Sequence, residues 1–266
     1  NLDLPFIKLL GKRAVMTYCG TDIRLFKVDK NRHLFPSLLE EAGYTALDDR
    51  KKILRMVWQR IWLARVTAPR NLYAHARQVF PSKMISTIWI NNIDIFSKSE
   101  GDFSACIPKP LIVNNSTLKI VHAPTSKKRK GTHIIERVID ELQAEGIEFD
   151  YQRIEGLAYS EARKLIELSD IVIDQIVIGG IGSLTLESLL LGKTVCVYVI
   201  DEIVEMLGGN LPILNVNPNN LKEELKIAIS DKALRAQLSE DAPQFVRKYV
   251  NVESILDELE SLYDLN

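Results

Sequence analysis

The apolar residues in the second half of the chain follow two alternating spacings. Short β-branched runs predict strands, and apolar residues three or four positions apart predict helices between them. The predicted strands span 118–122, 148–153, 171–178, 194–200 and 213–216. The predicted helices span 132–145, 160–168, 183–191 and two or three segments from 221, the last over 252–262. This alternation is typical of an α/β fold with a Rossmann-like, doubly wound parallel sheet, whose ligands bind at the carboxyl ends of the strands.

The first part of the chain has a less regular pattern. It predicts a strand over 13–19, a long helix after Asp48 and Asp49, a shorter helix over 71–77, a strand or turn over 79–82 and a strand over 87–90. One face of the long helix carries six apolar residues at helical spacing, namely Ile53, Leu54, Val57, Trp58, Ile61 and Trp62. Residues 91–102 are rich in turn formers. They predict a boundary between a partial N-terminal domain, 1–92, and a C-terminal domain, 93–266.

The composition is that of an ordinary globular protein, with 46% apolar and 26% charged residues. The three cysteines, Cys19, Cys106 and Cys196, lie far apart and lack the spacing of metal ligands. This use of cysteine indicates a reducing compartment, so we expect a cytoplasmic protein. Every apolar run is shorter than the roughly 20 residues that a membrane span needs. Because the chain begins with Asn, we expect its natural N-terminus to be missing.

Charge is distributed unequally along the chain. Residues 1–92 carry 16 lysines and arginines against 7 acidic residues, and the remainder carries 18 against 28. The basic excess is greatest over 50–66, where Trp58 and Trp62 accompany several lysines and arginines. This stretch fits an interfacial helix on an anionic membrane surface, or a helix whose apolar face packs on a sheet, and the two interpretations are compatible. Nucleic-acid binding is disfavoured because a recognisable motif and an aromatic platform are both missing from the sequence.

Two loops at predicted strand ends carry candidate chemistry. Residues 124–131 read PTSKKRKG and precede a helix, so their basic side chains and the helix N-terminus favour a phosphate site. The alternative is a solvated basic loop. Residues 179–182 read GGIG, and glycines there permit close approach of a ligand to the backbone, although a tight turn also needs glycine. Glu187 follows amid leucines, where an acid needs a partner, either a ligand hydroxyl pair or a protein group.

A dinucleotide site is a second possibility for the glycine turn. Gly180, Gly182 and Thr185 approximate the dinucleotide fingerprint, and Asp201 follows where an acid would bind ribose. Thr185 replaces the third glycine, however, and the unit is the third βα unit of its domain rather than the first. The basic loop would also be left without a role. We therefore rank this interpretation below nucleotide-diphosphate binding.

The two loops together resemble the donor-binding domain of retaining GT-B glycosyltransferases, the large family that includes many bacterial polysaccharide and lipid glycosylation enzymes. The residues that carry the resemblance read HAPTSKKRKGTHIIERVIDEL, IEGLAYSEARKLIELSDIVIDQ and GGIGSLTLESLLLGKTV. The resemblance implies that Lys130 and Gly131 contact the diphosphate of the donor. It also implies that Gly180, Gly182 and Ser183 form the glycine turn of the site, and that Glu187 binds the ribose hydroxyls.

The resemblance extends into the first part of the chain. Residues 20–24 look like a stretch late in the family's N-terminal domain, and residues 91–94 look like its interdomain linker. By this likeness Asp22 faces the cleft as a catalytic residue; the alternative is a turn residue paired with Arg24. The final helix is expected to cross back to the N-terminal domain. Much of that domain would precede Leu4, so the chain is either a fragment or has a reduced acceptor domain.

The sequence also departs from the family pattern. Gly179 occupies a position where the family often has an acid that contacts the donor sugar. Thr125 occupies the position of a usual arginine, for which Lys127, Arg129 or His122 are candidate replacements. His122 is alternatively a hydrogen-bonded loop residue at a strand end.

The resemblance implies a hexosyltransferase-type enzyme that moves a sugar from a UDP- or GDP-sugar to a saccharide or lipid-linked acceptor with retention. It implies no cofactor and no metal, with Lys130 as the principal cation that neutralises the leaving diphosphate. The enzyme would be cytoplasmic and peripheral on the inner face of the membrane. A nucleotide-sugar-binding module without catalysis is the main alternative.

Overall fold

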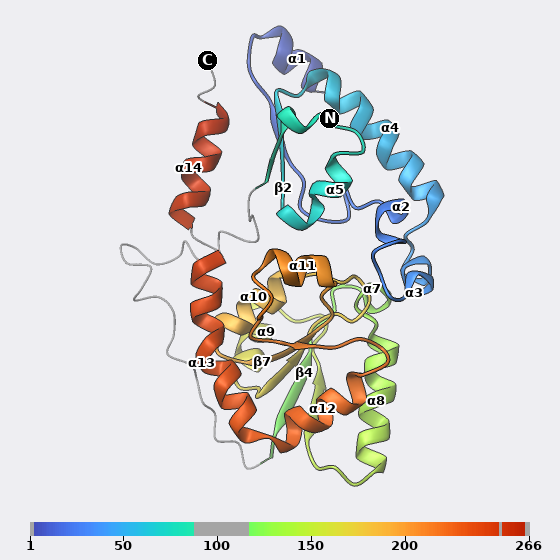
Figure 1. Cartoon of the computed structure of the whole chain (residues 1–266), viewed down its shortest axis with the longest axis vertical. Coiled ribbons are helices and arrows are strands. Elements are labelled where there is room, and N and C mark those ends of the chain that lie inside the picture. Colours follow the sequence, from blue (N-terminus) through green and yellow to red (C-terminus); the bar gives the residue numbers. More distant parts are fainter. Residues whose placement is uncertain (1–2, 88–116, 250–251, 264–266) are drawn as a thin grey trace. The chain divides into compact units, whose positions relative to one another are not determined.

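The computed structural model describes residues 3–87, 117–249 and 252–263. It divides into two compact units, Asn1–Ile93 with Tyr249–Asn266, and Asp94–Lys248 (Figure 1). The predicted boundary at 92/93 and the predicted linker at 91–94 lie outside the described residues. Among the described residues, none of the helices has the length and apolar character needed to cross a membrane.

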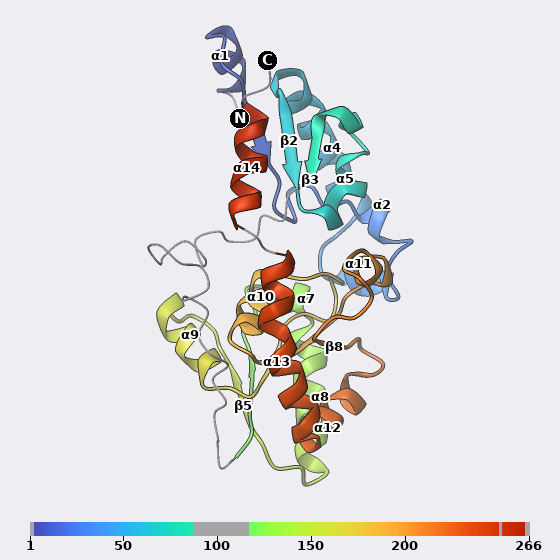
Figure 2. The ribbon, with the colours of Figure 1, turned by 60° about the vertical axis from the view of Figure 1, so that its left-hand side comes forward.

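The N-terminal unit is built on three parallel strands in the order β1-β2-β3. The strands are β1 (Val15–Thr17), β2 (Arg65–Ala68) and β3 (Ile85–Thr87). Its helices are α1 (Leu4–Leu9), α2 (Phe26–Asp29), α3 (Pro36–Glu41), α4 (Ala46–Trp62), η1 (Arg70–Leu72), α5 (Tyr73–Ala76), η2 (Ser82–Met84) and α14 (Val252–Tyr263). The last of these belongs to this unit although it lies at the end of the chain (Figure 2).

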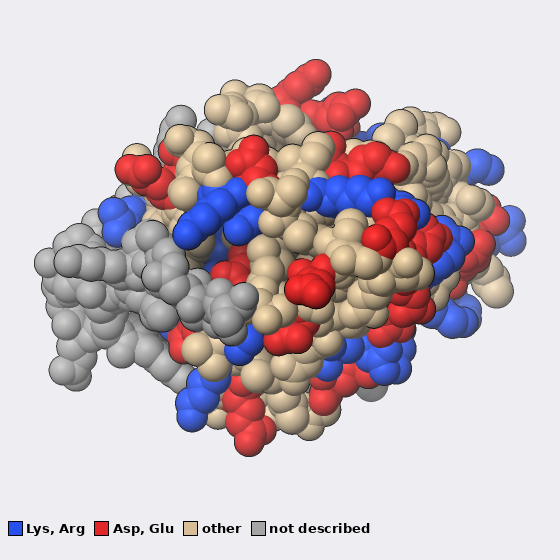
Figure 3. Space-filling model, turned by 90° about the horizontal axis from the view of Figure 1, so that it is seen from below, with Lys and Arg blue, Asp and Glu red and all other residues tan. Residues whose placement is uncertain are grey.

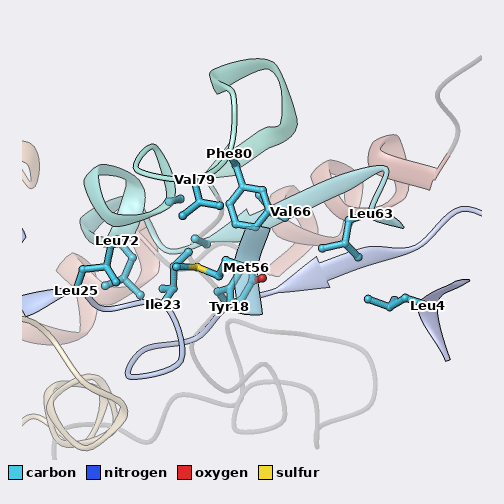
Figure 4. Packing of buried hydrophobic residues seen from close by; sticks show 12 residues of the cluster. Leu4, Tyr18, Ile23, Leu25, Met56, Leu63, Val66, Leu72, Val79 and Phe80 are labelled. Atoms are coloured by element: carbon cyan, nitrogen blue, oxygen red, sulfur yellow. The ribbon is translucent and has the colours of Figure 1, made fainter. Parts of the chain in front are cut away.

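Helix α4 begins at a capped N-terminus. The Thr45 hydroxyl accepts a hydrogen bond from the backbone N–H of Asp48 at 3.2 Å, and two acids in the first turn complement the helix dipole. Met56 of this helix is fully buried and packs with Tyr18, Val66 and Phe80 in the core of the unit (Figure 4). A capped helix with one buried face is thereby held against the sheet.

The predicted apolar face of α4 divides between the core and the solvent. Three of its residues, Ile53, Trp58 and Trp62, are partly buried against the core. The other three are exposed: Leu54 by 71%, Val57 by 47% and Ile61 by 57%. Six apolar positions span more of the helix circumference than one flat contact can cover, so the packing interpretation holds for only half of them.

A buried carboxylate joins the loop after β1 to the segment after β2. Asp29 accepts a hydrogen bond from Arg24 at 2.9 Å, and its Oδ1 lies 3.2 Å from His75 Nε2 and 3.6 Å from His33 Nε2. His75 Nδ1 accepts the backbone N–H of Leu25 at 2.9 Å, so the ring is neutral with its proton on Nε2, facing the carboxylate. The cluster therefore fixes two loops that are 50 residues apart in sequence.

The C-terminal unit contains a five-stranded parallel sheet in the order β5-β4-β6-β7-β8. The strands are β4 (Lys119–His122), β5 (Asp150–Arg153), β6 (Ile171–Ile173), β7 (Thr194–Val197) and β8 (Leu214–Asn215). The helices are α7 (Lys127–Lys130), α8 (Thr132–Ala144), α9 (Tyr159–Glu167), α10 (Ser183–Leu190), α11 (Asp201–Met206), α12 (Leu221–Ser230) and α13 (Lys232–Tyr249). Helices α8 and α12 lie side by side on one face of the sheet, and α9 and α10 cover the other (Figures 1 and 2). The predicted doubly wound parallel sheet is confirmed.

Three predicted features around the candidate loops of the C-terminal unit need correction. The strand predicted over 171–178 ends at Ile173, because the backbone then turns away to place Asp174 and Gln175 at the sheet edge. The basic loop contains one helical turn, α7. The helix predicted over 160–168 is α9 and begins at Tyr159, where the Glu161 carboxylate accepts the backbone N–H of Ala158 at 3.2 Å.

The surface of the C-terminal unit carries mixed charge. Basic and acidic side chains are interspersed on the face seen in Figure 3. Lys222 contacts Glu141 at 2.7 Å and Glu145 at 2.9 Å, which ties α12 to the end of α8. The acidic excess in this part of the sequence is thus partly neutralised by local ion pairs.

We predict that the Asp29 cluster makes the N-terminal unit sensitive to acid. Burial alone would raise the pKa of Asp29, but the neighbouring imidazoles of His33 and His75 and the charge of Arg24 lower it. Burial lowers the pKa of His75. Both groups therefore contribute stability that is fully present above their unfolded pKa values. As the pH falls, this contribution begins to be lost below about 6.5 for His75 and below about 3.9 for Asp29, and the loss is complete only below their lowered folded pKa values. Amide hydrogen exchange of peptides covering 20–36 and 69–78 should become faster when the pH is lowered from 7.5 to 5.5, after correction for the pH dependence of intrinsic exchange.

The matched variants are Asp29→Asn and His133→Gln, the latter at an exposed histidine of the other unit. Loss of the buried carboxylate should cost about 3–5 kcal/mol of local stability, because it leaves Arg24 uncompensated. The His133 variant should behave as wild type. Unchanged protection of both peptides in the Asp29 variant would show that the cluster does not hold these loops.

Candidate nucleotide-diphosphate site

The candidate site lies at the carboxyl ends of β4 and β6. These neighbouring strands are the point where the winding of the sheet reverses, since β5 follows β4 on one side and β6 lies on the other. Ligands of doubly wound sheets bind at such a switch point. The loop after β4 contains Lys130 and Gly131, and the loop after β6 contains the glycine turn. The topology therefore brings together the two loops that the sequence singled out.

Gly131 allows the two loops to touch. Its φ is +76°, in the left-handed region where α7 ends and α8 begins. A Cβ at this position would lie 2.6 Å from Ile176 Cγ1 and 3.0 Å from Val177 Cγ2. The carbonyl of Lys130 also accepts the backbone N–H of Ile176 at 3.1 Å. Only glycine meets both the conformation and the space.

The ammonium of Lys130 is held beside the N-terminus of α10. It forms an ion pair with Asp174, whose second carboxylate oxygen accepts the hydroxyl of Thr185 at 2.6 Å. Asp174 and Thr185 are fully buried, whereas the Lys130 side chain is 16% exposed. A Cβ at Gly182 would lie 3.3 Å from Asp174 Oδ2 and 3.9 Å from Lys130 Nζ. The cation thus sits against the glycine that caps α10.

The glycine turn is fixed by the side chain of Gln175. Its amide donates to the carbonyls of Gly180 and Tyr198, and its oxygen accepts the backbone N–H of Ile178 at 2.9 Å. Gly179 adopts a φ of +67° within this turn. The first backbone N–H groups of α10, beginning at Ser183, have no acceptor within their own helix and lie where the helix dipole is positive. Together with Lys130 they form an arrangement suited to an anion.

Glu187 lies one turn further along α10 and is half-buried. Burial raises the pKa of its carboxyl, and the negative charge of Asp174 adds to this. Tyr159 at the start of α9 donates its hydroxyl to Glu187 Oε2 at 3.2 Å. Glu187 therefore has a protein group as a partner, which was one of the two alternatives. Its second carboxylate oxygen can still accept a hydrogen bond from a ligand hydroxyl.

His122 lies beneath the site rather than in it. The ring is fully buried, Nδ1 donates to the carbonyl of Ile173 at 2.8 Å, and Nε2 accepts the hydroxyl of Thr132 at 2.9 Å. Burial lowers the pKa of His122, which favours this neutral form. The histidine joins β6 to α8 through both ring nitrogens, as the alternative of a hydrogen-bonded residue at a strand end expects.

The other two basic candidates, Lys127 and Arg129, are more exposed than Lys130. Lys127 is 55% exposed and pairs with Glu155 at 3.1 Å. Arg129 is exposed on the same single turn of helix. Lys130 is thus the member of the basic loop that this structure places against Gly182.

Asp22 belongs to the N-terminal unit. Its carboxylate accepts the backbone N–H groups of Gly20 at 2.8 Å and Cys19 at 3.3 Å, which makes it a turn residue. The expected pairing with Arg24 is wrong, because Arg24 bonds to Asp29.

Two residues of the site were missed in the sequence, Asp174 and Gln175, and a third, Thr185, was considered only as part of a dinucleotide fingerprint. A signal for the first two was available: polar residues directly after an all-apolar strand lie at the ligand-binding edge of a parallel sheet. The role of Thr185 had no local signal, because it depends on a carboxylate 11 positions away.

Solved structures that resemble the chain are glycosyltransferases of the GT-B fold. HepE from Anabaena, in complex with UDP and glucose, aligns over 99% of this chain and 75% of its own, with a TM-score of 0.65 and 13% identity. Sucrose-phosphate synthase from Thermosynechococcus elongatus aligns over 96% and 69%, with a TM-score of 0.63 and 14% identity. WaaG, a glycosyltransferase involved in lipopolysaccharide biosynthesis, aligns over 98% and 80%, with a TM-score of 0.59 and 11% identity.

No protein-family model and no curated protein sequence matches the chain. At 11–14% identity the likeness concerns the fold alone. The predicted GT-B-like architecture is confirmed.

We predict that Gly131→Ala is more damaging than Gly146→Ala. Both glycines have a left-handed φ, +76° and +81°, but nothing lies within 4 Å of a Cβ at Gly146. Gly146→Ala should cost about 1 kcal/mol for the backbone conformation. Gly131→Ala should cost about 1–3 kcal/mol more, because the new methyl overpacks buried Ile176. Denaturant unfolding of the two variants measures the difference. An equal decrease in the free energy of unfolding would show that the contact between Gly131 and Ile176 can rearrange without an energetic penalty.

Proposed function

We propose that the chain is the nucleotide-sugar-binding part of a glycosyltransferase, which moves a sugar from a UDP- or GDP-sugar to a hydroxyl acceptor. The observation that carries the proposal is the position of Lys130 against Gly182 at the N-terminus of α10, at the switch point of the sheet. An ammonium, free helical N–H groups and glycines that admit close approach are the features that bind a diphosphate. The likeness to glycosyltransferase structures, among them HepE bound to UDP-glucose, supports it.

The chemistry follows from charge. When the bond between sugar and diphosphate breaks, negative charge grows on the leaving phosphate, and Lys130 with the α10 N-terminus stabilises it without a metal. Glu187 accepts the ribose hydroxyls through the oxygen that Tyr159 leaves uncommitted. The sugar then passes to a saccharide or lipid-linked hydroxyl with retention at the anomeric carbon. Asp22 of the N-terminal unit is proposed as a further catalytic residue.

A nucleotide-sugar-binding module without catalysis is a second candidate. Gly179 supplies no side chain where an acid is expected to contact the sugar. Dinucleotide binding is less well supported: Thr185, in place of the third glycine, is committed to Asp174, and Asp201 is an exposed residue that begins α11. Donor turnover by the protein separates the enzyme from the module.

An anionic membrane surface is the proposed partner of residues 50–66. Leu54, Val57 and Ile61 form an exposed stripe on α4, next to exposed Arg50, Lys51 and Arg55. Lys8 of α1 donates to the carbonyl of Ile61 at 3.0 Å, which places a second short helix beside this stripe. Three further apolar residues in and directly after α1 are exposed: Phe6, Leu9 and Leu10. Apolar side chains flanked by cations fit anionic lipid, and such binding would keep a cytoplasmic enzyme near a lipid-linked acceptor.

Calorimetric titration with UDP, GDP and their sugars tests the proposed donor site. Lys130→Ala should weaken binding of the preferred nucleotide about ten- to hundredfold, through loss of one charge-assisted contact. Lys128→Ala is the matched control, because Lys128 is exposed on the same helical turn, and it should bind as wild type. Glu187→Gln should lose the preference for the nucleotide over its 2′,3′-dideoxy analogue. Equal affinity of the Lys130 variant and the wild type would refute the assignment.

Vesicle co-sedimentation tests the membrane partner. Wild type should sediment with anionic vesicles and remain soluble with neutral ones. Leu54→Ser with Ile61→Ser should reduce the bound fraction at least about tenfold, because each apolar side chain contributes about 1.5–3 kcal/mol when removed from water. Ile227→Ser, at a residue 44% exposed on α12, is the control. If the wild-type protein does not sediment with anionic vesicles, the proposed membrane partner is refuted.

A further inference from the structure

The acid at the centre of the candidate site has no role in the chemistry described so far. Asp174 is fully buried at the end of β6 and is committed on both oxygens, to Lys130 and to Thr185. Its backbone N–H bonds to the carbonyl of Cys196 at 2.9 Å, which fixes it to β7. Its position is therefore determined by three elements, and the ammonium of Lys130 is positioned by it in turn.

This acid changes the charge that an anionic ligand meets. The pair of Lys130 and Asp174 is neutral overall, so the site offers an oriented ion pair instead of a lone cation. An ammonium has three donors, and those not directed at Asp174 remain available to phosphate oxygens. The charge of Asp174 reaches other groups of the site, since it acts to raise the pKa of both Glu187 and His122. A bound diphosphate would experience the same negative charge.

We propose that Asp174 is a positioning residue for Lys130 that also limits the affinity of the site for nucleoside diphosphate. The inference rests on the proposed function. A site that stabilises the leaving diphosphate with a cation and a helix N-terminus also binds the free product, and tight binding of the product slows its release. Asp174 keeps the ammonium of Lys130 in place for the reaction. After the reaction, its negative charge repels the nucleoside diphosphate product and so favours release of that product.

A purely structural role for Asp174 makes the opposite prediction. If the acid only joined β6 to α10, its loss would loosen Lys130 and weaken every nucleotide. Asparagine at this position keeps the shape and an acceptor for Lys130 but removes the charge. The direction of the change in affinity therefore separates the two roles.

The test compares wild type with Asp174→Asn by calorimetry, using UDP, GDP, uridine and guanosine. The variant should bind the preferred diphosphate about tenfold more tightly, because one negative charge close to the phosphates is removed. The matching nucleoside, which has no phosphate, should bind with unchanged affinity. Diphosphate affinity that stays equal or falls in a variant with wild-type melting temperature would overturn the proposal.

Thr185→Val provides the second variant if Asp174→Asn does not fold. It keeps the charge of Asp174 but removes one of the groups that hold its carboxylate, so diphosphate affinity should fall about threefold through poorer placement of Lys130. An unchanged affinity would overturn the positioning role. Failure of the wild type to bind any diphosphate, or insensitivity to Lys130→Ala, would refute the proposed function itself and this inference with it. Failure of the proposed function is therefore detected with the wild type and the Lys130 variant alone, separately from failure of the Asp174 inference.

Discussion

The ion pair between Lys130 and Asp174 is the contact on which the C-terminal unit depends at its ligand-binding edge. It joins the loop after β4 to the loop after β6, and these are the two strands between which the sheet reverses its winding. The close packing of Gly131 on Ile176 and the bond from Ile176 to the carbonyl of Lys130 reinforce the same junction. A buried carboxylate is costly unless it is paired and hydrogen-bonded, and here both oxygens are satisfied. The junction consequently fixes a cation, a glycine cap and a helix N-terminus in one place.

The N-terminal unit uses a similar device for a different purpose. Asp29 is also buried and joins two loops that follow neighbouring parallel strands. Its partners, Arg24 and two histidines, are buried with it, so the cluster stabilises the loops rather than offering a charge to a ligand. In the C-terminal unit Lys130 remains partly exposed. This difference in exposure of the cation distinguishes a candidate binding site from a structural cluster.

The position of Glu187 is the reason for proposing a nucleotide diphosphate rather than another anion. Glu187 lies one helical turn beyond the N-terminus of α10 and is hydrogen-bonded by Tyr159. An acid at that spacing suits the ribose of a nucleotide whose diphosphate lies at the N-terminus of the helix. Gly179 supplies no acidic side chain for a sugar, so the proposal for the nucleotide rests on more residues than the proposal for the sugar.

Local patterns in the sequence determined the parallel α/β architecture, because the alternation of strand and helix periods needs no knowledge of distant contacts. They also located the two loops and marked Gly182 and Glu187, since glycines at strand ends and acids among leucines have a direct physical meaning. The family resemblance singled out Lys130 and Gly131 within the basic loop. The tertiary structure alone decided which side chains meet. Lys130 and Asp174 are 44 positions apart and become neighbours only because β4 and β6 are adjacent in the sheet, a consequence of strand order that no local pattern encodes. The same holds for His122, which strand packing buries beneath the site, and for α4, where the curvature of the helix surface decides which apolar residues reach the core and which remain in solvent.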